Sequence, residues 1–583
     1  MDNKSIAAIF YETADLMEIN GDDPFRIRSY RRAAETLEGY PHQVASFAED
    51  IKRLLEIPGI GKGMATNIQE LVNTGSLPLH QELRTKYRSS MQELLKIQGL
   101  GPKTIALIWS AFQVGDVDGV EKLATEGKLQ TLPRMSAKSE QKILKAIEDY
   151  RRISGRFLID EADRTAARLA EHLSHIPGIE SITPAGSFRR GKETVGDLDI
   201  LITGPCCDDI AQREALLDEI ARFPGIDQVL AKGDNKISVR LGTGLQVDVR
   251  ALTPNSYGAG LQYFTGSKNH GVAMRQRALR MGLTLNEYGL YRLDSNECIA
   301  GRTEEEIYQA LKLDWIPPEL RENTGEIEAA ERHELPSLIT VADIRGEIHM
   351  HTVETDGRNT IDEMAQAAKQ RGYQYIAITD HTKNLAMAFG LDDQRAVEHI
   401  ARIRAVNERV EGITILAGIE VDILVDGELD LSDSVLEQMD VVVASVHSAF
   451  NQDKSQMTDR LLRALSNKNV SILGHPTGRL LLRRDAYQFD FEAVLKLAGE
   501  NRVAMELNAY PDRLDLNDVH LRMSRERGVK VVINTDAHHT SHFEKIKYGI
   551  LQARRAWLTP QDVLNTLPET ALRQAMKHQW PMN

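Results

Sequence analysis

The sequence predicts a multidomain protein with a helical N-terminal region, an α+β region in the middle and a distorted α/β barrel at the C-terminus. Residues 1–150 carry apolar side chains at helical spacing, and residues 151–260 alternate helical patterns with short strands of period two. After residue 342, six buried-looking strands each end in a residue of metal-ligand type. A length of 583 residues fits three to five domains, at roughly 150 residues each.

Composition excludes several classes of protein. The 42% hydrophobic and 27% charged residues are typical of a globular protein, and no apolar run approaches the roughly 18 residues of a membrane span. The first residues do not form a signal peptide, so we expect a cytoplasmic protein without membrane contact. Its three cysteines give neither a disulfide framework nor a zinc spacing. The net charge of −14 restricts any nucleic-acid contact to local sites.

Two related segments, Ile57–Gly63 and Ile97–Lys103, each lie between two helical patterns. A Gly-x-Gly turn directs backbone amides outward at a helix N-terminus, which forms a small anion-binding nest. One such turn can simply join two helices. Two of them about 40 residues apart, both followed by lysines, favour contact with a DNA backbone. The glycines expected at this contact are Gly59, Gly61, Gly63, Gly99 and Gly101.

The middle region contains the turn Gly186-Ser187-Phe188-Arg189-Arg190-Gly191 and, directly after it, Asp197-Leu198-Asp199. Residues two apart on a strand share a face, so Asp197 and Asp199 project together, and Asp248 joins them if its strand is a neighbour. Paired acids at a strand end are commonly only solvated. Here the turn also offers amides, a hydroxyl and arginines to a polyphosphate. The combination favours nucleotidyl transfer with two Mg²⁺ or Mn²⁺ ions.

With Tyr263-Phe264-Thr265-Gly266, these elements resemble the X family of DNA polymerases over roughly residues 1–317. The two N-terminal segments resemble the helix-hairpin-helix motifs of that family. The resemblance implies that Asp197, Asp199 and Asp248 are the catalytic metal ligands. Tyr263 and Phe264 would line the sugar pocket, although both residue types also suit core packing. The implied contacts to the incoming deoxynucleoside triphosphate are Gly186, Ser187, Arg190, Gly196, Tyr263, Phe264 and Gly266.

The chain departs from the family pattern at two places. Asn67 stands where members with deoxyribose-phosphate lyase activity have a lysine, so the amine that forms a Schiff base is missing. We therefore predict weak or absent lyase activity, unless Lys62 substitutes. The order Lys268-Asn269-His270-Gly271 also differs from the usual one, and its effect on nucleotide binding stays open.

The C-terminal region is rich in histidine, with 11 of the 17 histidines after residue 342. Mixed imidazole and carboxylate ligation suits Mn²⁺, Zn²⁺ or Fe²⁺ better than Mg²⁺. Motifs such as Gly474–Arg479 and Asn534–His538 resemble the PHP (polymerase and histidinol phosphatase) family over roughly residues 343–575. Arg479 and Arg513 would bind substrate phosphate or lie on the surface. The resemblance implies up to three ions held by His349, His351, Asp356, His381, Glu420, His447, His475, Asp536 and His538.

Between these regions lies an acidic segment, with six glutamates and two arginines from Glu319 to Thr340, which predicts a solvated linker. The expected domains are a helical, lyase-like DNA-binding domain (1–85), a helix-hairpin-helix fingers region (86–150), a nucleotidyltransferase palm (151–260), a thumb-like dNTP-binding subdomain (261–317), the linker (318–342) and a PHP phosphoesterase domain (343–583).

Together these features predict a monomeric DNA polymerase that fills short gaps in gapped or nicked DNA during base-excision or break repair. Its PHP domain would act as a metal-dependent 3′-5′ exonuclease or 3′-end phosphoesterase. Two alternatives stay open. The PHP site hydrolyses a small phosphate ester instead, or the chain is a DNA-binding scaffold with residual metal sites.

Overall fold

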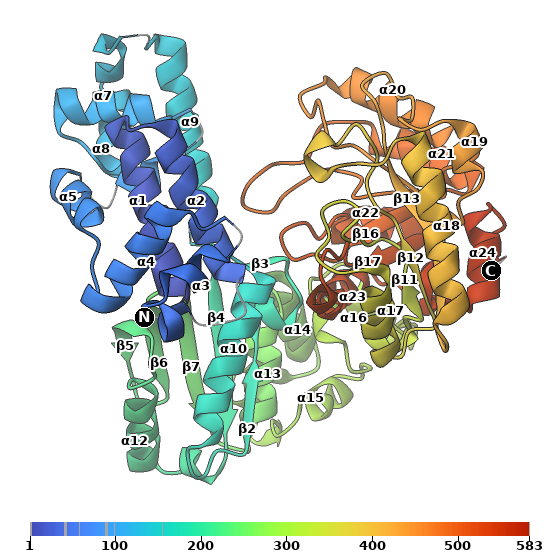
Figure 1. Cartoon of the computed structure of the whole chain (residues 1–583). Coiled ribbons are helices and arrows are strands. Elements are labelled where there is room, and N and C mark those ends of the chain that lie inside the picture. Colours follow the sequence, from blue (N-terminus) through green and yellow to red (C-terminus); the bar gives the residue numbers. More distant parts are fainter. Residues whose placement is uncertain are drawn as a thin grey trace. The chain divides into compact units, whose positions relative to one another are not determined.

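The computed structural model describes residues 3–39, 44–57, 59–87, 91–97, 99–133, 135–153 and 155–581. The chain divides into two compact units, Met1–Gly155 and Arg156–Asn583 (Figure 1). Pro58 and Gln98, which belong to the two predicted turns, lie outside the described residues. Within the described ranges, no helix has the length and apolar character needed to cross a membrane.

The first unit is built from helices around one apolar core. Buried side chains of this core run from Ile6 to Ile147, so the two N-terminal segments that the sequence predicts as separate domains share a single core. The elements are α1 (Asn3–Asn20), α2 (Pro24–Gly39), η1 (Val44–Phe47), α3 (Ile51–Leu55), α4 (Lys62–Thr74), α5 (Pro78–Lys86), α6 (Met91–Leu94), α7 (Pro102–Phe112), α8 (Val117–Thr125), η2 (Lys128–Thr131) and α9 (Ala137–Ile153).

Both predicted helix-hairpin-helix segments lie between helices of this unit. Gly59 and Gly99 have φ angles of +88° and +91°, a conformation that favours glycine. Gly61 and Gly101 are the N-caps of α4 and α7, so the Gly-x-Gly turns lie directly at two helix N-termini. The free backbone amides of a helix start are therefore available at both turns.

The second unit begins with a five-stranded sheet of order β2-β4-β7-β6-β5. Strands β4 and β7 are parallel neighbours, and the other pairs are antiparallel. Leu198, Ile200 and Ile202 of β4 are buried in the core, which leaves the aspartates of β4 outside that core. The elements are β1 (Phe157–Leu158), α10 (Ile159–Ser174), β2 (Ser181–Pro184), α11 (Gly186–Arg189), β3 (Thr194–Val195), β4 (Asp197–Thr203), η3 (Pro205–Cys207), α12 (Ile210–Ile220), β5 (Ile226–Lys232), β6 (Lys236–Leu241) and β7 (Gln246–Leu252).

A smaller subdomain follows, with a three-stranded antiparallel sheet, and it continues through residues 318–342. The sequence predicts a solvated linker there, but these residues are folded. Arg321 and Glu326 are fully buried, and Ile327 and Ala330 belong to the subdomain's core. The elements are α13 (Tyr257–Thr265), α14 (Lys268–Arg280), β8 (Leu283–Asn286), β9 (Gly289–Arg292), β10 (Cys298–Ala300), α15 (Glu304–Ala310), η4 (Pro318–Leu320), α16 (Glu326–Glu331) and η5 (Val341–Asp343).

The C-terminal part is a barrel of seven parallel strands in sequence order, β11 to β17. A parallel bridge between Met350 and Ala537 joins the ends of the first and last strands, so the barrel is nearly closed, as the sequence predicts. The strands are β11 (Gly346–Glu347), β12 (Tyr375–Ile378), β13 (Thr414–Asp422), β14 (Val441–Ser445), β15 (Ile472–Leu473), β16 (Ala504–Asn508) and β17 (Val531–Asn534).

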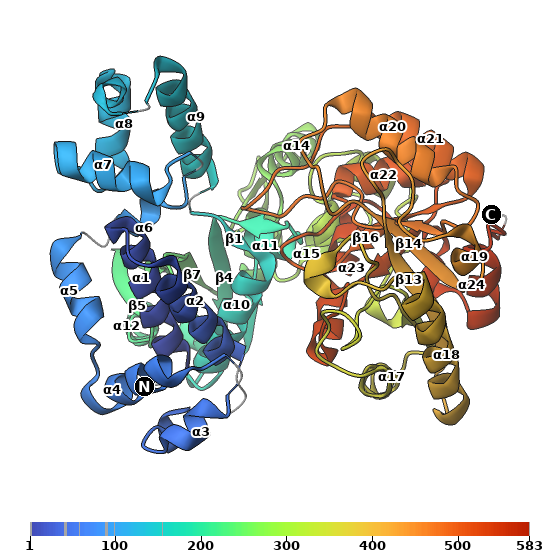
Figure 2. The same cartoon turned by 45° about the horizontal axis from the view of Figure 1, so that its top comes forward.

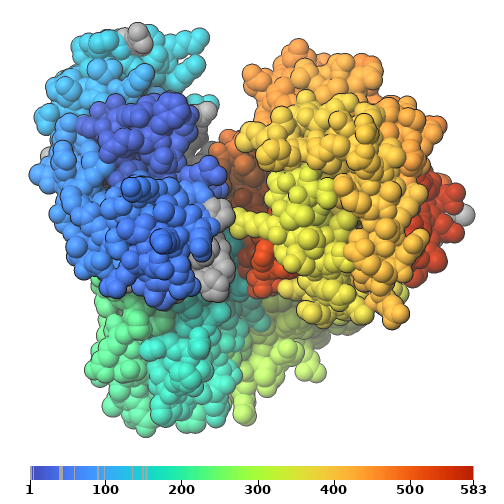
Figure 3. Space-filling view, viewed as in Figure 1, coloured from blue at the N-terminus to red at the C-terminus, as the bar shows by residue number. Residues whose placement is uncertain are grey.

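Helices cover the outside of this barrel (Figure 2), and in the space-filling view the yellow and orange segments form much of its visible surface (Figure 3). The carboxyl ends of parallel strands meet at one edge of such a barrel, where side chains from several strands converge. The helical elements are α17 (Ile361–Gln370), η6 (Ala386–Ala388), α18 (Asp393–Arg409), α19 (Asp433–Leu436), α20 (Lys454–Leu465), α21 (Phe491–Asn501), α22 (Asp518–Glu526), η7 (Thr540–Lys545), α23 (Ile546–Arg555), η8 (Pro560–Asp562), η9 (Leu564–Thr566) and α24 (Glu569–Met576).

Candidate active sites

The first candidate site lies on β4 and β7. The parallel register places Asp199 directly beside Asp248, and Asp197 precedes Asp199 by two residues on the same face. The three carboxylates are therefore neighbours, as the sequence predicts for adjacent strands. They are more widely spread than the compact ligand clusters of the barrel, whose ligand atoms lie within 4.8 Å of one another. The ammonium of Lys236 contacts Asp248 Oδ2 at 2.6 Å, so a cation already compensates one member of the triad.

Asp199 has an unusual pKa. Its burial raises the pKa of the carboxyl, and the charges of Asp197 and Asp248 raise it further, to about 6. The pKa of Asp248 is lowered instead, because hydrogen bonds from Lys236 and Ser238 outweigh its burial. Crowded carboxylates without a cation between them are electrostatically costly, which is the condition that a bound divalent cation relieves.

The Gly-Ser turn lies against this triad. Gly186 has a φ of +62°, and a Cβ added at this position would lie 2.6 Å from Asp199 Oδ2. The amide of Ala185 donates to the backbone oxygen of Asp199 at 2.8 Å. Glycine at position 186 therefore allows the turn to reach the aspartate that the sequence predicts to be catalytic.

Three of the other predicted nucleotide contacts, Arg190, Tyr263 and Phe264, take part in contacts that join the turn, the Tyr263–Gly266 motif and β7. Arg190 donates from Nη1 to the backbone oxygen of Thr265 at 2.7 Å, which joins the turn to the Tyr263–Gly266 motif. The guanidinium of Arg250 lies 4.1 Å from the ring centroid of Phe264, which joins that motif to β7. Tyr263 is 38% exposed and packs edge-to-face on Phe264. Sequence segments up to about 80 residues apart thus form one site.

Sequence reasoning missed the charged residues that hold Arg190. Glu322 accepts from Arg190 Nε at 3.0 Å and from Arg555 Nη1 at 2.9 Å. Arg555 belongs to α23 of the barrel region and also donates to the backbone oxygen of Arg190 at 2.9 Å. Glu322 is partly buried, which raises its pKa, but Arg190, Arg555 and Lys192 lower it to about 2. The partners of Glu322 are too distant in sequence for a local pattern to reveal them.

His270, in the segment that departs from the family pattern, is fully buried. Its Nδ1 lies 2.7 Å from Glu326 Oε1, and its Nε2 lies 3.3 Å from the hydroxyl of Tyr308. Burial lowers the pKa of His270, and the charge of Glu326 opposes that shift. The imidazole is therefore part of the subdomain's interior.

The second candidate site is at the carboxyl edge of the barrel. Eight of the nine predicted ligands fall into three clusters whose ligand atoms lie within 4.8 Å of one another, and Asp356 and His538 are the more open members. The ninth, His475, places Nε2 3.0 Å from Glu420 Oε1. The clusters are His351, Asp356, His381 and His538; His349, His351 and Asp536; and His381, Glu420 and His447.

The donor atoms of this site fit bound metal ions. Six nitrogen and oxygen atoms of the cluster are buried without a hydrogen-bond partner among the described residues, although several lie near a carboxylate. One example is His351 Nε2, 2.9 Å from Asp536 Oδ1. Buried polar atoms are rarely left unpaired, so a shared external ligand explains them best. They are His349 Nε2, both ring nitrogens of His351, His381 Nδ1, Glu420 Oε2 and Asp536 Oδ1.

The pKa shifts differ among the ligands. Burial lowers the pKa of His349, His381, His447 and His538, but nearby carboxylates outweigh it and raise these pKa values, whereas the pKa values of Glu420 and His351 shift in the direction that suits metal binding. Burial raises the pKa of Glu420, but the imidazoles of His447, His349 and His381 lower it well below its usual range, so the carboxylate stays ionised. Burial lowers the pKa of His351 to about 4, and the neighbouring His381 and His538 contribute, so His351 stays neutral. An ionised carboxylate and a neutral imidazole are the forms that bind metals.

Two buried acids contact these ligands and a third holds the loop that follows one of them; sequence reasoning missed all three. Glu506 of β16 accepts from His349 Nδ1 at 2.7 Å and from the amide of His475 at 2.8 Å. Asp422 lies 3.1 Å from His447 Nδ1. Asp380 accepts from Thr352 in the loop that follows His351. The sequence does contain a signal for them, because an acid within an apolar strand, such as Glu506, or directly before a ligand, such as Asp380, needs a buried partner. Such partners fix the ring orientation of ligating histidines.

The two arginines considered for phosphate binding take different places. Arg479 pairs with Glu193 at 2.7 Å and is mostly buried, so it joins the barrel to the preceding α+β region. Arg513 lies with Nε 3.9 Å from Asp536 Oδ2 and is partly exposed. Of these two arginines, Arg513 is therefore the one beside the ligand cluster.

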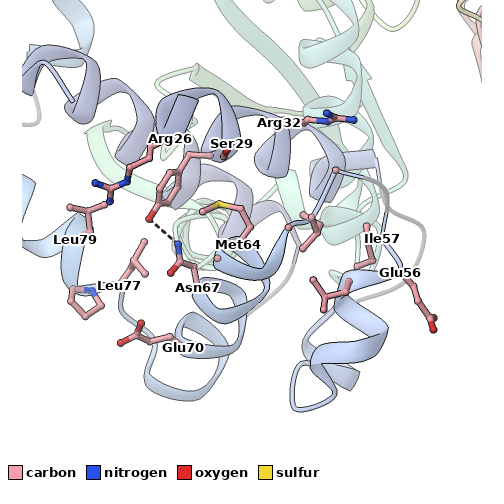
Figure 4. Close-up of a pocket in the computed structure, with 17 residues that line it drawn as sticks. Arg26, Ser29, Arg32, Glu56, Ile57, Met64, Asn67, Glu70, Leu77 and Leu79 are labelled. Carbon is pink, nitrogen blue, oxygen red and sulfur yellow. Dashed lines mark hydrogen bonds between the residues drawn. The ribbon is translucent and has the colours of Figure 1, made fainter. Parts of the chain in front are cut away.

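The helical unit has a separate pocket of about 960 Å³ between α2 and α4 (Figure 4). Asn67 lines it and donates from Nδ2 to the hydroxyl of Tyr30 at 2.8 Å. Arg26 and Arg32 also line the pocket, and no lysine is among the described residues that do. The position that the sequence singles out for a missing Schiff-base amine thus holds a hydrogen-bonded amide.

Five family models match the chain. They are the helix-hairpin-helix domain (1–77), the SAM-like helix-hairpin-helix tandem (91–149), the DNA polymerase beta palm (157–231), the DNA polymerase beta thumb (260–322) and the PHP domain (347–510). The palm and thumb matches include the predicted turn and the Tyr263–Gly266 motif. Asp536 and His538 lie beyond the PHP match, and the barrel geometry brings them into the same clusters.

Whole-chain similarity agrees with these matches. The chain is 39% identical over 567 residues to the DNA polymerase/3′-5′ exonuclease PolX of Bacillus subtilis (strain 168), which covers 97% of each chain. It is 29% identical over 229 residues to a probable phosphatase of Thermoanaerobacter sp. (strain X514), covering 37% of this chain and 89% of the relative. A probable phosphatase of Photobacterium profundum is 30% identical over 213 residues, which covers 34% of this chain and 81% of the relative. The chain therefore belongs to the X family of DNA polymerases, in the bacterial branch that carries a C-terminal PHP domain.

Proposed function

We propose that this chain is a DNA-directed DNA polymerase that fills short gaps in gapped or nicked DNA during base-excision or break repair. We further propose that its PHP domain removes nucleotides from 3′ ends as a metal-dependent 3′-5′ exonuclease. The register of β4 and β7 carries the first proposal, because it sets Asp199 beside Asp248 where the Gly186 turn meets the Thr265 backbone. Such a site suits in-line phosphoryl transfer.

At the polymerase site, Asp197, Asp199 and Asp248 would hold Mg²⁺ or Mn²⁺. These ions supply charge neutralisation for phosphoryl transfer when they are bound. The chain's own groups would bind and orient the dNTP. Ser187, Arg190 and Gly186 of the turn, with Gly196, would contact the triphosphate, while Tyr263, Phe264 and Gly266 would line the sugar. Arg190 is suited to this role because Glu322 and the Thr265 carbonyl fix its guanidinium.

The helix-hairpin-helix turns would hold the DNA backbone. Gly59 and Gly99 are required by their φ angles. Gly61, Gly63 and Gly101 are exposed, and a Cβ added at any of them would meet no atom within 4 Å. Packing inside the protein does not explain these three glycines. Close approach of a phosphate to the backbone amides does explain them.

At the PHP site, the nine predicted residues would hold up to three ions of Mn²⁺, Zn²⁺ or Fe²⁺, which supply Lewis acidity towards a phosphoester when bound. Arg513 would bind the scissile phosphate, since it lies beside Asp536 and is partly exposed. We place the enzyme in the cytoplasm, together with its DNA and dNTP substrates, and expect it to act as a monomer.

A second candidate function for the PHP site is hydrolysis of a small phosphate ester. The similarity of part of the chain to the two probable phosphatases favours it. The first candidate remains our choice, because the relative that matches nearly the whole chain is named a 3′-5′ exonuclease.

The test uses a 5′-labelled primer on gapped DNA with the full chain and two variants. We expect Asp199→Ala to abolish primer extension and keep 3′ shortening. We expect His351→Ala to abolish shortening and keep extension. Shortening that survives His351→Ala, together with His351-dependent hydrolysis of p-nitrophenyl phosphate, would favour the small-ester function. Failure of the wild-type chain to extend the primer with both Mg²⁺ and Mn²⁺ would favour the scaffold alternative.

The predicted lack of lyase activity is tested separately. Asn67 cannot form a Schiff base, so borohydride should trap no covalent adduct between the full chain and DNA carrying a 5′-deoxyribose phosphate. An adduct that persists in Lys62→Ala would contradict the prediction, whereas an adduct that disappears in this variant would identify Lys62 as the substitute amine.

A further inference from the structure

The loop 382–391 leaves the barrel directly after the predicted ligand His381 and returns to the same residue. The amide of Leu391 donates to the backbone oxygen of His381 at 2.8 Å, and the amide of Lys383 donates to that of Leu391 at 3.0 Å. Gly390 packs so closely on the Thr382 carbonyl that a Cβ would clash with it. Both ends of this loop are therefore fixed at the metal cluster.

The tip of the loop presents two large apolar side chains to solvent. Met387 is 92% exposed and Phe389 is 74% exposed, the highest fractions among the large hydrophobic residues that the structure describes. Val353, on the loop between His351 and Asp356, is 52% exposed. Two loops that leave the same candidate site thus expose apolar side chains, and contiguous exposed apolar surface marks binding sites.

Hydrogen bonds from Arg395 hold the backbone at the tip of the 382–391 loop. Arg395 of α18 donates from Nη1 to the backbone oxygens of Phe389 at 2.8 Å and Gly390 at 3.0 Å. Its Nη2 reaches the backbone oxygen of Glu354 at 3.4 Å, which ties the tip to the 352–358 loop. At the base, Asp430 accepts from the amide of Asn384 at 2.9 Å. Hydrogen bonds therefore fix the backbone of the loop at Asn384 and at Phe389–Gly390, next to the exposed side chains.

The ligand cluster of the PHP site is open beside the 352–358 loop. Most of its side chains are buried, whereas those of Asp356 and His538 are 36% and 29% exposed. The amide of Arg358 donates to the backbone oxygen of His538 at 2.8 Å, so the 352–358 loop borders the opening. The side chain of Arg358 is exposed and makes no ion pair with a described residue, so it is available to a phosphate. A phosphoester that enters beside Asp356 passes the 352–358 loop. Arg395 connects this loop to the tip of the 382–391 loop.

We propose that Met387 and Phe389 form a stacking platform for the bases next to the 3′ terminus of the DNA strand that the PHP site shortens. This inference rests on the proposed exonuclease function. Stacking on an aromatic face tolerates any base, as an enzyme that removes successive nucleotides requires. The nearby cation Arg358 suits the phosphates on either side of the stacked bases. A small phosphate ester has no base for this platform.

The test compares the wild-type chain with the double variant Met387→Ser, Phe389→Asn. Asparagine tolerates the φ of +56° at position 389, so the loop backbone is preserved. On a 5′-labelled single-stranded oligonucleotide with Mn²⁺, we expect kcat/KM for shortening to fall by about tenfold or more, mainly through KM. Bound manganese per chain and hydrolysis of p-nitrophenyl phosphate should not change. Phe389→Trp should keep wild-type shortening, as should the control Val519→Ala, which alters another exposed apolar residue.

A second experiment removes the DNA bases that would stack on Met387 and Phe389, and leaves the protein unchanged. Oligonucleotides with abasic nucleotides beside the 3′ end should be shortened about tenfold more slowly by the wild-type chain, with little further loss in the double variant. An unchanged rate in the double variant, or an equal abasic penalty in both proteins, would overturn the platform. So would an equal loss of p-nitrophenyl phosphate hydrolysis. A wild-type chain that binds manganese but shortens no DNA would instead refute the exonuclease function itself.

Discussion

Asp199→Asn should stabilise the metal-free protein while it abolishes nucleotide addition. The ionised carboxylate is unfavourable in the folded chain, since burial and two neighbouring aspartates raise its pKa from 3.8 to about 6. A rise of this size corresponds to about 3 kcal/mol of unfolding free energy, an upper bound because solvent still reaches this group. Asparagine has nearly the same shape and carries no charge, so it escapes this penalty.

The raised pKa of Asp199 determines how the free energy of unfolding changes with pH. The stability that Asp199 contributes is fully present below pH 3.8, where the carboxyl is protonated in both states, and is lost as the pH rises through about 6. The advantage of the Asp199→Asn variant should therefore grow from roughly 1.5 kcal/mol at pH 5 to about 3 kcal/mol at pH 8. For a unit of the size of Arg156–Asn583, 3 kcal/mol is a rise in Tm of roughly 3 °C.

The assay is thermal unfolding in EDTA at several pH values, followed by the same series with Mg²⁺ or Mn²⁺. Added metal should raise the Tm of the wild type more than that of Asp199→Asn. The difference in Tm between the two proteins should therefore become smaller. Asp227→Asn, on an exposed position of β5 in the same sheet, should leave Tm unchanged in both series. If the variant is no more stable than the wild type at pH 8 in EDTA, or if its advantage does not vary with pH, the reasoning about Asp199 is wrong.

Three further outcomes follow from the structure. Gly186→Ala should lower primer extension at least tenfold and stability by about 1–2 kcal/mol, because its Cβ would lie 2.6 Å from Asp199 Oδ2 at a φ of +62°; wild-type extension would contradict this. Arg555→Gln should raise KM for dNTP by about fivefold, since it removes a partner of Glu322, and equal damage to 3′ shortening would argue for general unfolding instead. Glu506→Gln should weaken manganese binding by the PHP domain about 10–100-fold in calorimetric titration, whereas unchanged affinity would mean that this carboxylate does not orient the ligands.

Much of both sites could be predicted because the necessary information is local. Asp197-x-Asp199 shares one face of β4 by simple alternation, so both side chains project together. His349 and His351 follow the end of β11 and still meet in one ligand cluster, although the strand on which the sequence places them is shorter than expected. The ligands that end successive apolar strands are equally local signals. A parallel barrel brings all its carboxyl strand ends to one edge, so the histidine-rich site can be predicted from residues that end successive strands.

Residue types, the face shared by Asp197 and Asp199, and the family can therefore be predicted from sequence, whereas the partners of these residues depend on the tertiary fold. The segment 318–342 is acidic, which predicts solvation, yet Glu322 binds Arg555 and Glu326 binds His270. Likewise, Glu506 becomes a support for two histidines only when β16 takes its place in the barrel. Charge counts and periodicity describe a residue and its near neighbours. A glutamate's burial depends on a cation or imidazole brought to it by the fold, and that partner is visible only in three dimensions.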